Sequence, residues 1–295
     1  MKGAGMLLLS LIIAHLIADF YLQTDRMVQD KLKNIKKHIF HHFLVNAAVL
    51  SAGWLFFYEQ NDLVTTVLWP VLYITGTHLI IDMVKIQLVD QYTSREHLSK
   101  LWFFIVDQAL HLFMLLTAMQ LFYEISLVSN VDRFINLLFE EGRNLDASAT
   151  MLVIVIILIL GTSVSGHMIR ILLGSLPGQL LTFEGKYTFK NELKEQAYPQ
   201  ANRGERGLSE QYSYMIFNKH DMSRGKLIGY IERLLVILLT YYSSYPAIAF
   251  IVTAKSIARF KQMDDRDWAE YFLLGTLTSM FLGIMFGILL REILN

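Results

Sequence analysis

The chain has 295 residues, of which 54% are hydrophobic, and its 26 Lys and Arg balance 26 Asp and Glu to a formal net charge of zero. Long apolar blocks separated by short charged loops are typical of a helical membrane protein, and the balanced charge argues against a nucleic-acid partner. The sequence contains no cysteine, which excludes disulfides and thiolate metal sites and leaves histidine and carboxylates as strong metal ligands.

Apolar blocks of spanning length follow one another at residues 6–22, 40–57, 64–88, 101–127, 151–173, 227–257 and 269–290. The 227–257 block exceeds the roughly 20 residues that one crossing needs. The stretch from Tyr242 to Pro246 near its middle is typical of a tight turn, so we expect two short helices there. The sequence therefore predicts an all-α fold, a polytopic transmembrane helical bundle of about eight spans.

Charged residues in the loops predict the orientation of these spans. The loop after the first span carries Arg26 and four lysines against Asp25 and Asp30, whereas the loop after the second has only Glu59 and Asp62. By the positive-inside rule, the first of these loops is cytoplasmic. Counting onward places the acidic loop 128–150 outside, the polar segment 174–226 inside, and both termini outside.

We divide the chain into three predicted parts, the middle one of which contains the longest polar segment, residues 174–226. Residues 1–127 form a four-helix transmembrane bundle, and residues 128–226 comprise an exterior loop, the fifth span and a cytoplasmic insertion. Residues 227–295 form a C-terminal transmembrane helical module. Its last span contains Gly283 and Gly287, a spacing that allows another helix to approach closely.

Histidine and aspartate occur in pairs within the first four spans. The pairs are His15/Asp19, His38/His42, His78/Asp82 and Asp107/His111. Each pair has a spacing of four residues, which places both side chains on one face of a helix. All four pairs lie toward the predicted cytoplasmic ends of their helices, so antiparallel packing brings them to one level.

This set of side chains predicts a divalent metal site, with zinc or manganese as the expected ion. Imidazole and carboxylate groups on facing helices can complete the coordination of one ion or two. One such pair alone is more often a packing pair, but four at matched depth favour a site, because ionisable groups within membranes are costly. The expected ligands or their hydrogen-bonding partners are His15, Asp19, His78, Asp82, Asp107 and His111. His38 and His42 are the candidates for completing the site or handling protons.

Several strings resemble a known family. The strings AHLIADFYLQTD, KHIFHH, THLIID and DQALH together resemble the bacterial membrane family called domain of unknown function 3307, whose name conveys no activity. The C-terminal strings GKLIGYIERLLVILL, YPAIAFIVTAKSIARF and AEYFLLGTLTSMFLG resemble the second half of its longer members. The H-x3-D pairs are also similar to those of LexA-regulated membrane-bound metal-dependent hydrolases, which implies phosphoester hydrolysis at clustered metals. The resemblance places the chain in the bacterial cytoplasmic (inner) membrane.

Charged residues also occur at the predicted cytoplasmic level of the last three spans. They are Glu232, Arg233, Lys255, Arg259 and Glu270. In one interpretation the two glutamates neutralise the cations in a structural network. In the other, Arg233, Lys255 and Arg259 form a pocket for a substrate phosphate.

We therefore predict an integral membrane metal-dependent hydrolase that acts on a phosphoester, a lipid or a nucleotide, at the cytoplasmic membrane face. One alternative is a metal or proton transporter, although the exterior halves of the first four spans are almost wholly apolar. Another is a non-catalytic sensor or anchor that recruits a soluble partner through residues 174–226. The expected partners are membrane lipids and either a soluble cytoplasmic protein or a second copy of the chain, without direct nucleic-acid binding.

Overall fold

The computed structural model describes residues 2–24, 27, 31–92, 97–124, 146–174, 219–260, 263 and 266–294. Helices dominate these residues, and no strand occurs among them, which confirms the all-α prediction. Most of the acidic loop 128–150 and of the polar segment 174–226 lies outside the described residues, as do Asp25 and Arg26.

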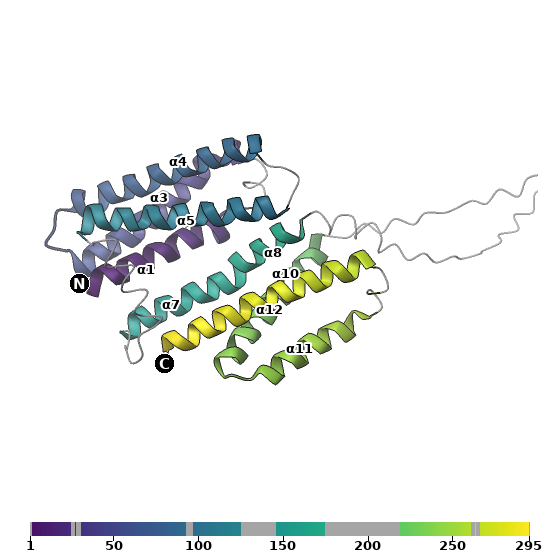
Figure 1. The fold of residues 1–295 in the computed structure, drawn as a ribbon. Helices are drawn as coiled ribbons and strands as arrows, with labels where there is room; N and C mark the ends of the chain where they lie inside the picture. The colour runs from purple at the N-terminus through teal and green to yellow at the C-terminus, as the bar shows by residue number, and fades with distance from the viewer. Residues whose placement is uncertain are drawn as a thin grey trace, which may run out of the picture.

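The first half of the described chain forms a closed four-helix bundle (Figure 1). Its elements are α1 (Lys2–Ile17) with the π-helical turn η1 (Ala18–Leu22), α3 (Lys31–Phe57), the π-helical turn η2 (Val64–Leu68) with α4 (Trp69–Tyr92), and α5 (His97–Tyr123). Each helix contacts the next along the chain, and α5 returns to contact α1. This arrangement is antiparallel, so the end of α1, the start of α3, the end of α4 and the start of α5 share one end of the bundle.

The second half packs beside this bundle. It consists of α7 (Ala147–Ile159), the π-helical turn η3 (Leu160–Val164), α8 (Ser165–Leu173), α10 (Lys219–Tyr241), α11 (Tyr245–Ala258) and α12 (Arg266–Leu294). Contacts of α7 with α1 and of α8 with α5 join the two halves, while α12 packs along α10. The start of α1 and the end of α12 lie at the same end of the molecule (Figure 1), as an even number of crossings requires.

The block at residues 227–257 is divided as expected. Helix α10 ends at Tyr241 and α11 begins at Tyr245, with Pro246 in its first turn. Ser243 between them has a positive φ of 55°, a conformation typical of tight turns. The predicted turn is therefore confirmed.

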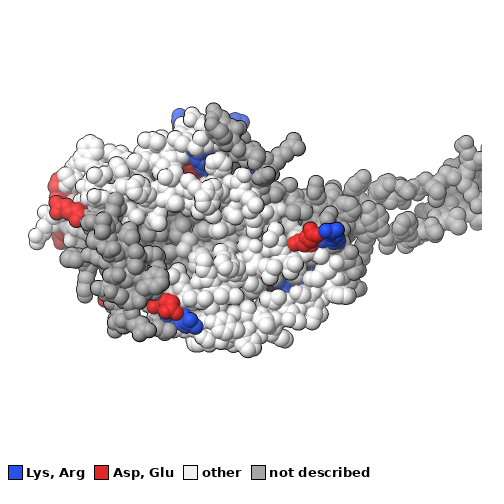
Figure 2. Space-filling view, in the orientation of Figure 1, with Lys and Arg blue, Asp and Glu red and all other residues white. Residues whose placement is uncertain are grey.

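Six helical segments of the described chain are long and apolar enough to cross a membrane: Gly3–Leu22, Lys33–Phe57, Val64–Leu88, Leu98–Tyr123, Ala147–Leu173 and Trp268–Leu294. Helix α11 is a shorter apolar helix of 14 residues, and α10 contains Glu232 and Arg233. The described part of the face in Figure 2 is mostly uncharged, as contact with lipid requires. The protein thus has the architecture of a helical membrane protein, while the count of about eight spans and their orientation stay predictions.

Two glycines determine how α10 and α12 pack. A Cβ atom on Gly283 would lie 2.8 Å from Val236 Cγ1, and one on Gly287 would lie 2.5 Å from Thr240 Cβ. A larger residue at either position would therefore push the helices apart. The close helix contact predicted from the Gly283-x3-Gly287 spacing is formed within the chain.

An apolar core fills the half of the four-helix bundle nearest the start of α1. Leu11, Leu50, Ile74, Leu115 and Met119 are between 0% and 2% exposed in it. Leu11 precedes His15 by one helical turn, and Leu115 follows His111 by one turn. The packed core therefore directly adjoins the level of the histidines.

Candidate metal centre

Five histidine rings from all four helices of the bundle meet at one level. The ring centroids of His42 and His78 are 3.8 Å apart, and those of His78 and His111 are 4.3 Å apart. His15 stacks on His111 at 4.8 Å, and His38 lies 4.6 Å from His42. All five residues are at most 6% exposed. The structure therefore brings together the histidines of all four predicted pairs.

Carboxylates flank this group of rings. Asp19 Oδ1 lies 2.9 Å from His42 Nε2, and Asp82 Oδ2 lies 3.3 Å from His38 Nε2. The Nε2 atoms of His38 and His78 are 3.2 Å apart, which is hydrogen-bonding distance for rings in complementary tautomers. Imidazole nitrogens and carboxylate oxygens thus converge on a common volume.

Several imidazole nitrogens in the centre lack hydrogen-bond partners among the described residues. His111 Nδ1 donates to the backbone carbonyl of Asp107 at 2.8 Å, and this bond leaves the lone pair of the ring on Nε2. Among the described residues, neither His111 Nε2 nor His15 Nε2 has a hydrogen-bond partner, and Asp107 Oδ1 also lacks one. Buried acceptors without partners are costly, so these atoms fit ligands of a cation.

The donor atoms fall into two overlapping groups, within each of which all atoms lie within 4.8 Å of one another. One group contains Asp19, His38, His42 and His78, and the other contains His78, Asp82 and His111. His78 belongs to both groups. His15 and Asp107, also predicted ligands, contact this set through the His111 ring and the Asp107 backbone carbonyl.

The π-helical turn η1 sets the position of Asp19. The α-helical pattern of α1 ends at Ile17, and the wider turn begins at Ala18. Such π turns occur frequently at functional sites because they change the direction of the side chains that follow. The Asp19 side chain, 13% exposed, lies within reach of both His15 and His42.

Lys85 and Gln108 of the centre, and the buried Asn46, are absent from the sequence prediction. Lys85 Nζ donates to Asp107 Oδ2 at 2.5 Å, and the Gln108 amide lies between Asp19 Oδ2 at 3.4 Å and Asp107 Oδ2 at 3.3 Å. Asn46, one turn after His42 on α3, is 2% exposed. Helical spacing carries a signal for two of the three, since Lys85 follows Asp82 by three residues and Asn46 follows His42 by four.

Exposure within the centre rises toward the end of the bundle where α1 ends and α3 begins. The Lys85 side chain is 29% exposed and Asp19 is 13% exposed, whereas His42, His78 and His111 are each 1% exposed. The apolar core adjoins the centre on the opposite side. The centre is therefore reached most directly from the end that the charge pattern predicts to be cytoplasmic.

The charged residues of the C-terminal half have different surroundings. Arg233 is 4% exposed and donates to the backbone carbonyls of Gly161 at 2.7 Å and Thr162 at 3.2 Å, both in η3. Lys255 pairs with Glu232 at 2.6 Å, and Arg259 lies 5.5 Å from the Trp268 ring centroid. A phosphate-binding role for Arg233, Lys255 and Arg259 stays a prediction.

Residues 7–138 match the model of the family described as "Protein of unknown function (DUF3307)". This range contains every residue of the candidate metal centre. The chain matches neither a curated protein nor a solved structure. The predicted resemblance is thus confirmed over residues 7–138, which include the four-helix bundle and its candidate metal centre.

Proposed function

We propose that the protein is an integral membrane metal-dependent hydrolase that acts on a phosphoester at the cytoplasmic face of the bacterial inner membrane. The observation that carries this proposal is the gathering of five buried histidines with Asp19, Asp82 and Asp107, in which several imidazole nitrogens have no hydrogen-bond partner among the described residues. Ionisable side chains within membrane spans are expensive and mark functional sites.

The donor set fits a divalent cation. Carboxylates buried in an apolar bundle need a balancing positive charge, and neutral imidazoles cannot supply it. Nitrogen and oxygen donors in a site without thiolates are suited to zinc or manganese. When bound, such an ion lowers the pKa of a water molecule and polarises a phosphoryl oxygen, the two requirements of phosphoester hydrolysis.

The remaining groups can move the proton of the attacking water. His38 Nε2 lies 3.3 Å from Asp82 Oδ2, so the carboxylate stabilises the imidazolium that forms when His38 accepts a proton. The nearby His78 Nε2, at 3.2 Å, fixes the orientation of the His38 ring. His38 is therefore the proposed general base, with Asp82 as its orienting partner.

The packing of the bundle favours hydrolysis over transport. A transport path needs polar groups or a cavity across the whole membrane. Fully buried Leu11, Leu50 and Leu115 instead fill the bundle on the far side of the histidines. This arrangement supports a site that is entered and left from one side.

The test is elemental analysis of detergent-purified full-length protein, followed by turnover of phosphatidic acid and glycerol 3-phosphate. We expect near-stoichiometric zinc or manganese in the wild type, loss of metal and turnover in Asp19→Ala and Asp82→Ala, and no change in Glu59→Gln, an exposed carboxylate. A folded wild type that stays metal-free after incubation with either ion would contradict the proposal. Bound metal without turnover of any phosphoester would instead favour the sensor or anchor.

A further inference from the structure

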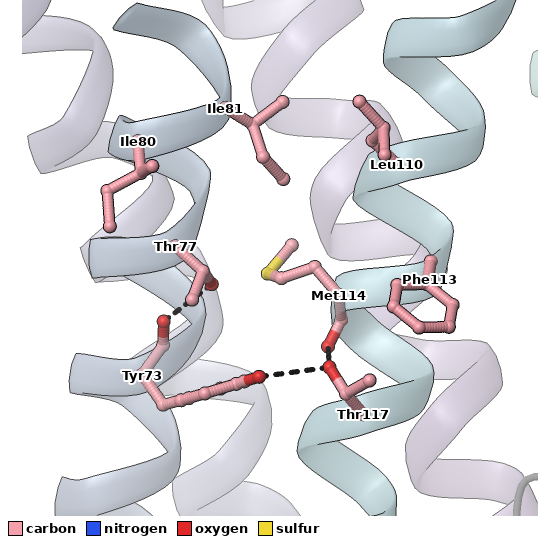
Figure 3. Close-up of a pocket in the computed structure, with 8 residues that line it drawn as sticks. All are labelled: Tyr73, Thr77, Ile80, Ile81, Leu110, Phe113, Met114 and Thr117. Atoms are coloured by element: carbon pink, nitrogen blue, oxygen red, sulfur yellow. Dashed lines mark hydrogen bonds between the residues drawn. The ribbon is translucent and has the colours of Figure 1, made fainter. Parts of the chain in front are cut away.

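An apolar groove with a volume of about 290 Å³ runs along the outer face of the bundle between α4 and α5 (Figure 3). Ile80, Leu110 and Phe113 form its walls and are 62%, 47% and 57% exposed. Ile81 and Met114 lie between the helices and form its floor (Figure 3). The groove therefore opens sideways, toward the lipid that surrounds α4 and α5.

A hydrogen bond closes one end of the groove. Tyr73 Oη and Thr117 Oγ1 lie 3.0 Å apart and link α4 to α5 (Figure 3). Thr77 lies between this bond and Ile81, and its hydroxyl donates to the Tyr73 carbonyl at 2.7 Å. Its polar atom is thus satisfied by its own helix, so it adds little polarity to the groove.

The other end of the groove leads to the metal centre. One helical turn beyond Ile81 and Leu110 come Lys85 and Asp107, which pair across the same two helices. His78 and His111, next in sequence to Thr77 and Leu110, meet on the inner side of this seam with ring centroids 4.3 Å apart. A ligand in the groove would thus have its far end beside the centre.

Lys85 lies near the end of the apolar span. It precedes Leu88, the last residue of the apolar span, by three residues, which corresponds to about 4.5 Å along the helix. Its side chain is 29% exposed and can extend toward the membrane surface. A lysine at this depth attracts anionic headgroups.

We propose that the groove holds one acyl chain of an anionic phospholipid whose phosphate binds Lys85, so that the hydrolase substrate is a phosphate-bearing membrane lipid. The substrate assignment rests on the proposed function, whereas the binding site rests on the groove and Lys85. An acyl chain gains little by moving from the bilayer into an apolar groove, because both surroundings are apolar. Attraction between the phosphate and Lys85 therefore decides which lipids occupy the groove.

Asp107 connects this site to the metal centre. Its Oδ2 accepts from Lys85, while its Oδ1 has no hydrogen-bond partner among the described residues. A phosphate that binds Lys85 takes over part of the role of Asp107 as its counter-ion. The phosphate would then lie next to the carboxylate that adjoins His111, within reach of the centre.

The experiment is photocrosslinking of the full-length protein in phosphatidylcholine nanodiscs. The probe is a phosphonate analogue of phosphatidic acid, which resists hydrolysis, with a diazirine in one acyl chain; diacylglycerol with the same diazirine is the neutral comparison. We expect the phosphonate to label residues 73–81 and 110–117 more strongly than it labels α12. Diacylglycerol should label these residues and α12 equally. Equal labelling of all lipid-facing helices by both probes would overturn the site.

Matched variants separate the two parts of the binding site. Thr77→Trp fills the groove and should reduce groove labelling to the level on α12. Its control, Thr278→Trp, replaces a threonine on α12 that bonds to its own helix in the same way, with a 2.8 Å contact to the Leu274 carbonyl. Lys85→Met should reduce phosphonate labelling by about fivefold, while Lys36→Met, at an exposed lysine of α3, should not. Labelling unaffected by Thr77→Trp and Lys85→Met would overturn the proposal.

Turnover measurements distinguish failure of this site from failure of the hydrolase. If both proposals hold, Thr77→Trp lowers turnover of phosphatidic acid and leaves turnover of glycerol 3-phosphate unchanged. Selective labelling of the groove without turnover of any phosphoester would retain the lipid site and reject the hydrolase. If the protein turns over both phosphoesters and Thr77→Trp changes neither rate, the hydrolase proposal is retained and the groove is rejected as its substrate site.

Discussion

The two halves of the molecule treat buried polar groups differently. In the C-terminal half, Arg233 donates to two carbonyls of η3 and Lys255 pairs with Glu232, so these cations have partners within the fold. In the four-helix bundle, His15 and His111 each retain an Nε2 atom without a hydrogen-bond partner among the described residues. Buried imidazole nitrogens without partners are costly, and a cluster of them beside carboxylates fits the ligands of a cation.

Arg233 illustrates how a buried charge can be satisfied within the fold. Two carbonyls of the π turn η3, those of Gly161 and Thr162, accept from its guanidinium. The guanidinium presents several donors in a planar arrangement that a lysine could not reproduce. The other π turn, η1, contains Asp19 of the candidate metal centre, so each half has a π turn beside a buried ionic group.

The largest effect that distinguishes the halves is expected from His78→Ala. His78 belongs to both groups of donor atoms, so its removal should weaken metal binding by more than about 100-fold. The matched control is His41→Ala, which removes a histidine from α3 outside both groups. Elemental analysis and competition with a metal-chelating dye measure the change. If the two variants bind metal equally, the histidines of the bundle are packing residues.

Arg233→Met tests the opposite expectation in the C-terminal half. The substitution removes the guanidinium bonds to the carbonyls of Gly161 and Thr162, which should lower the free energy of unfolding by about 2–4 kcal/mol. The metal content should stay at the wild-type level. Unfolding in mixed micelles and elemental analysis give the two readings. Loss of metal from a folded Arg233→Met protein would show that the halves are coupled and break the contrast between them.

Gly287→Ala probes packing without changing a polar group. The new Cβ would lie 2.5 Å from Thr240 Cβ and 2.9 Å from the Ile237 carbonyl oxygen, so α10 and α12 must separate. We expect a loss of about 1–3 kcal/mol in the free energy of unfolding. Gly76→Ala is the control, because a Cβ there meets no atom within 4 Å, and it should stabilise α4 by up to about 1 kcal/mol. Equal effects of the two substitutions would contradict the close packing of α10 on α12.

In both halves, local rules of the chain allowed features to be predicted from the sequence. The pairs in the bundle could be predicted because a spacing of four residues fixes the helical face and antiparallel packing fixes the level. The turn between α10 and α11 could be predicted from the residues around Pro246. Both inferences use local rules of the chain.

Contacts between distant residues escaped prediction. Lys85 and Asp107 are 22 residues apart, and Arg233 and Gly161 are 72 apart, so each contact depends on how two helices are rotated against each other. The π turns η1 and η3 change this rotation, and no spacing rule used for the sequence anticipates them. The groove between α4 and α5 likewise arises from packing and has no sequence motif of its own.

The smallest effect is expected from Tyr73→Phe, which removes a hydrogen bond that serves packing within the four-helix bundle itself. Hydrogen bonds between membrane helices contribute about 0.6 kcal/mol on average, so the free energy of unfolding should fall by about that amount. Metal content should not change, because Tyr73 lies more than one helical turn from His78 along α4. The free energy of unfolding in mixed micelles is measured for Tyr73→Phe, Thr117→Val and the double variant. This double-mutant cycle isolates the coupling free energy of the Tyr73–Thr117 pair. A coupling free energy near zero would mean that shape alone joins α4 to α5 at this end. Loss of metal from Tyr73→Phe would mean that packing residues of the four-helix bundle also support the candidate metal centre, so that the two roles are not separated between the halves of the chain.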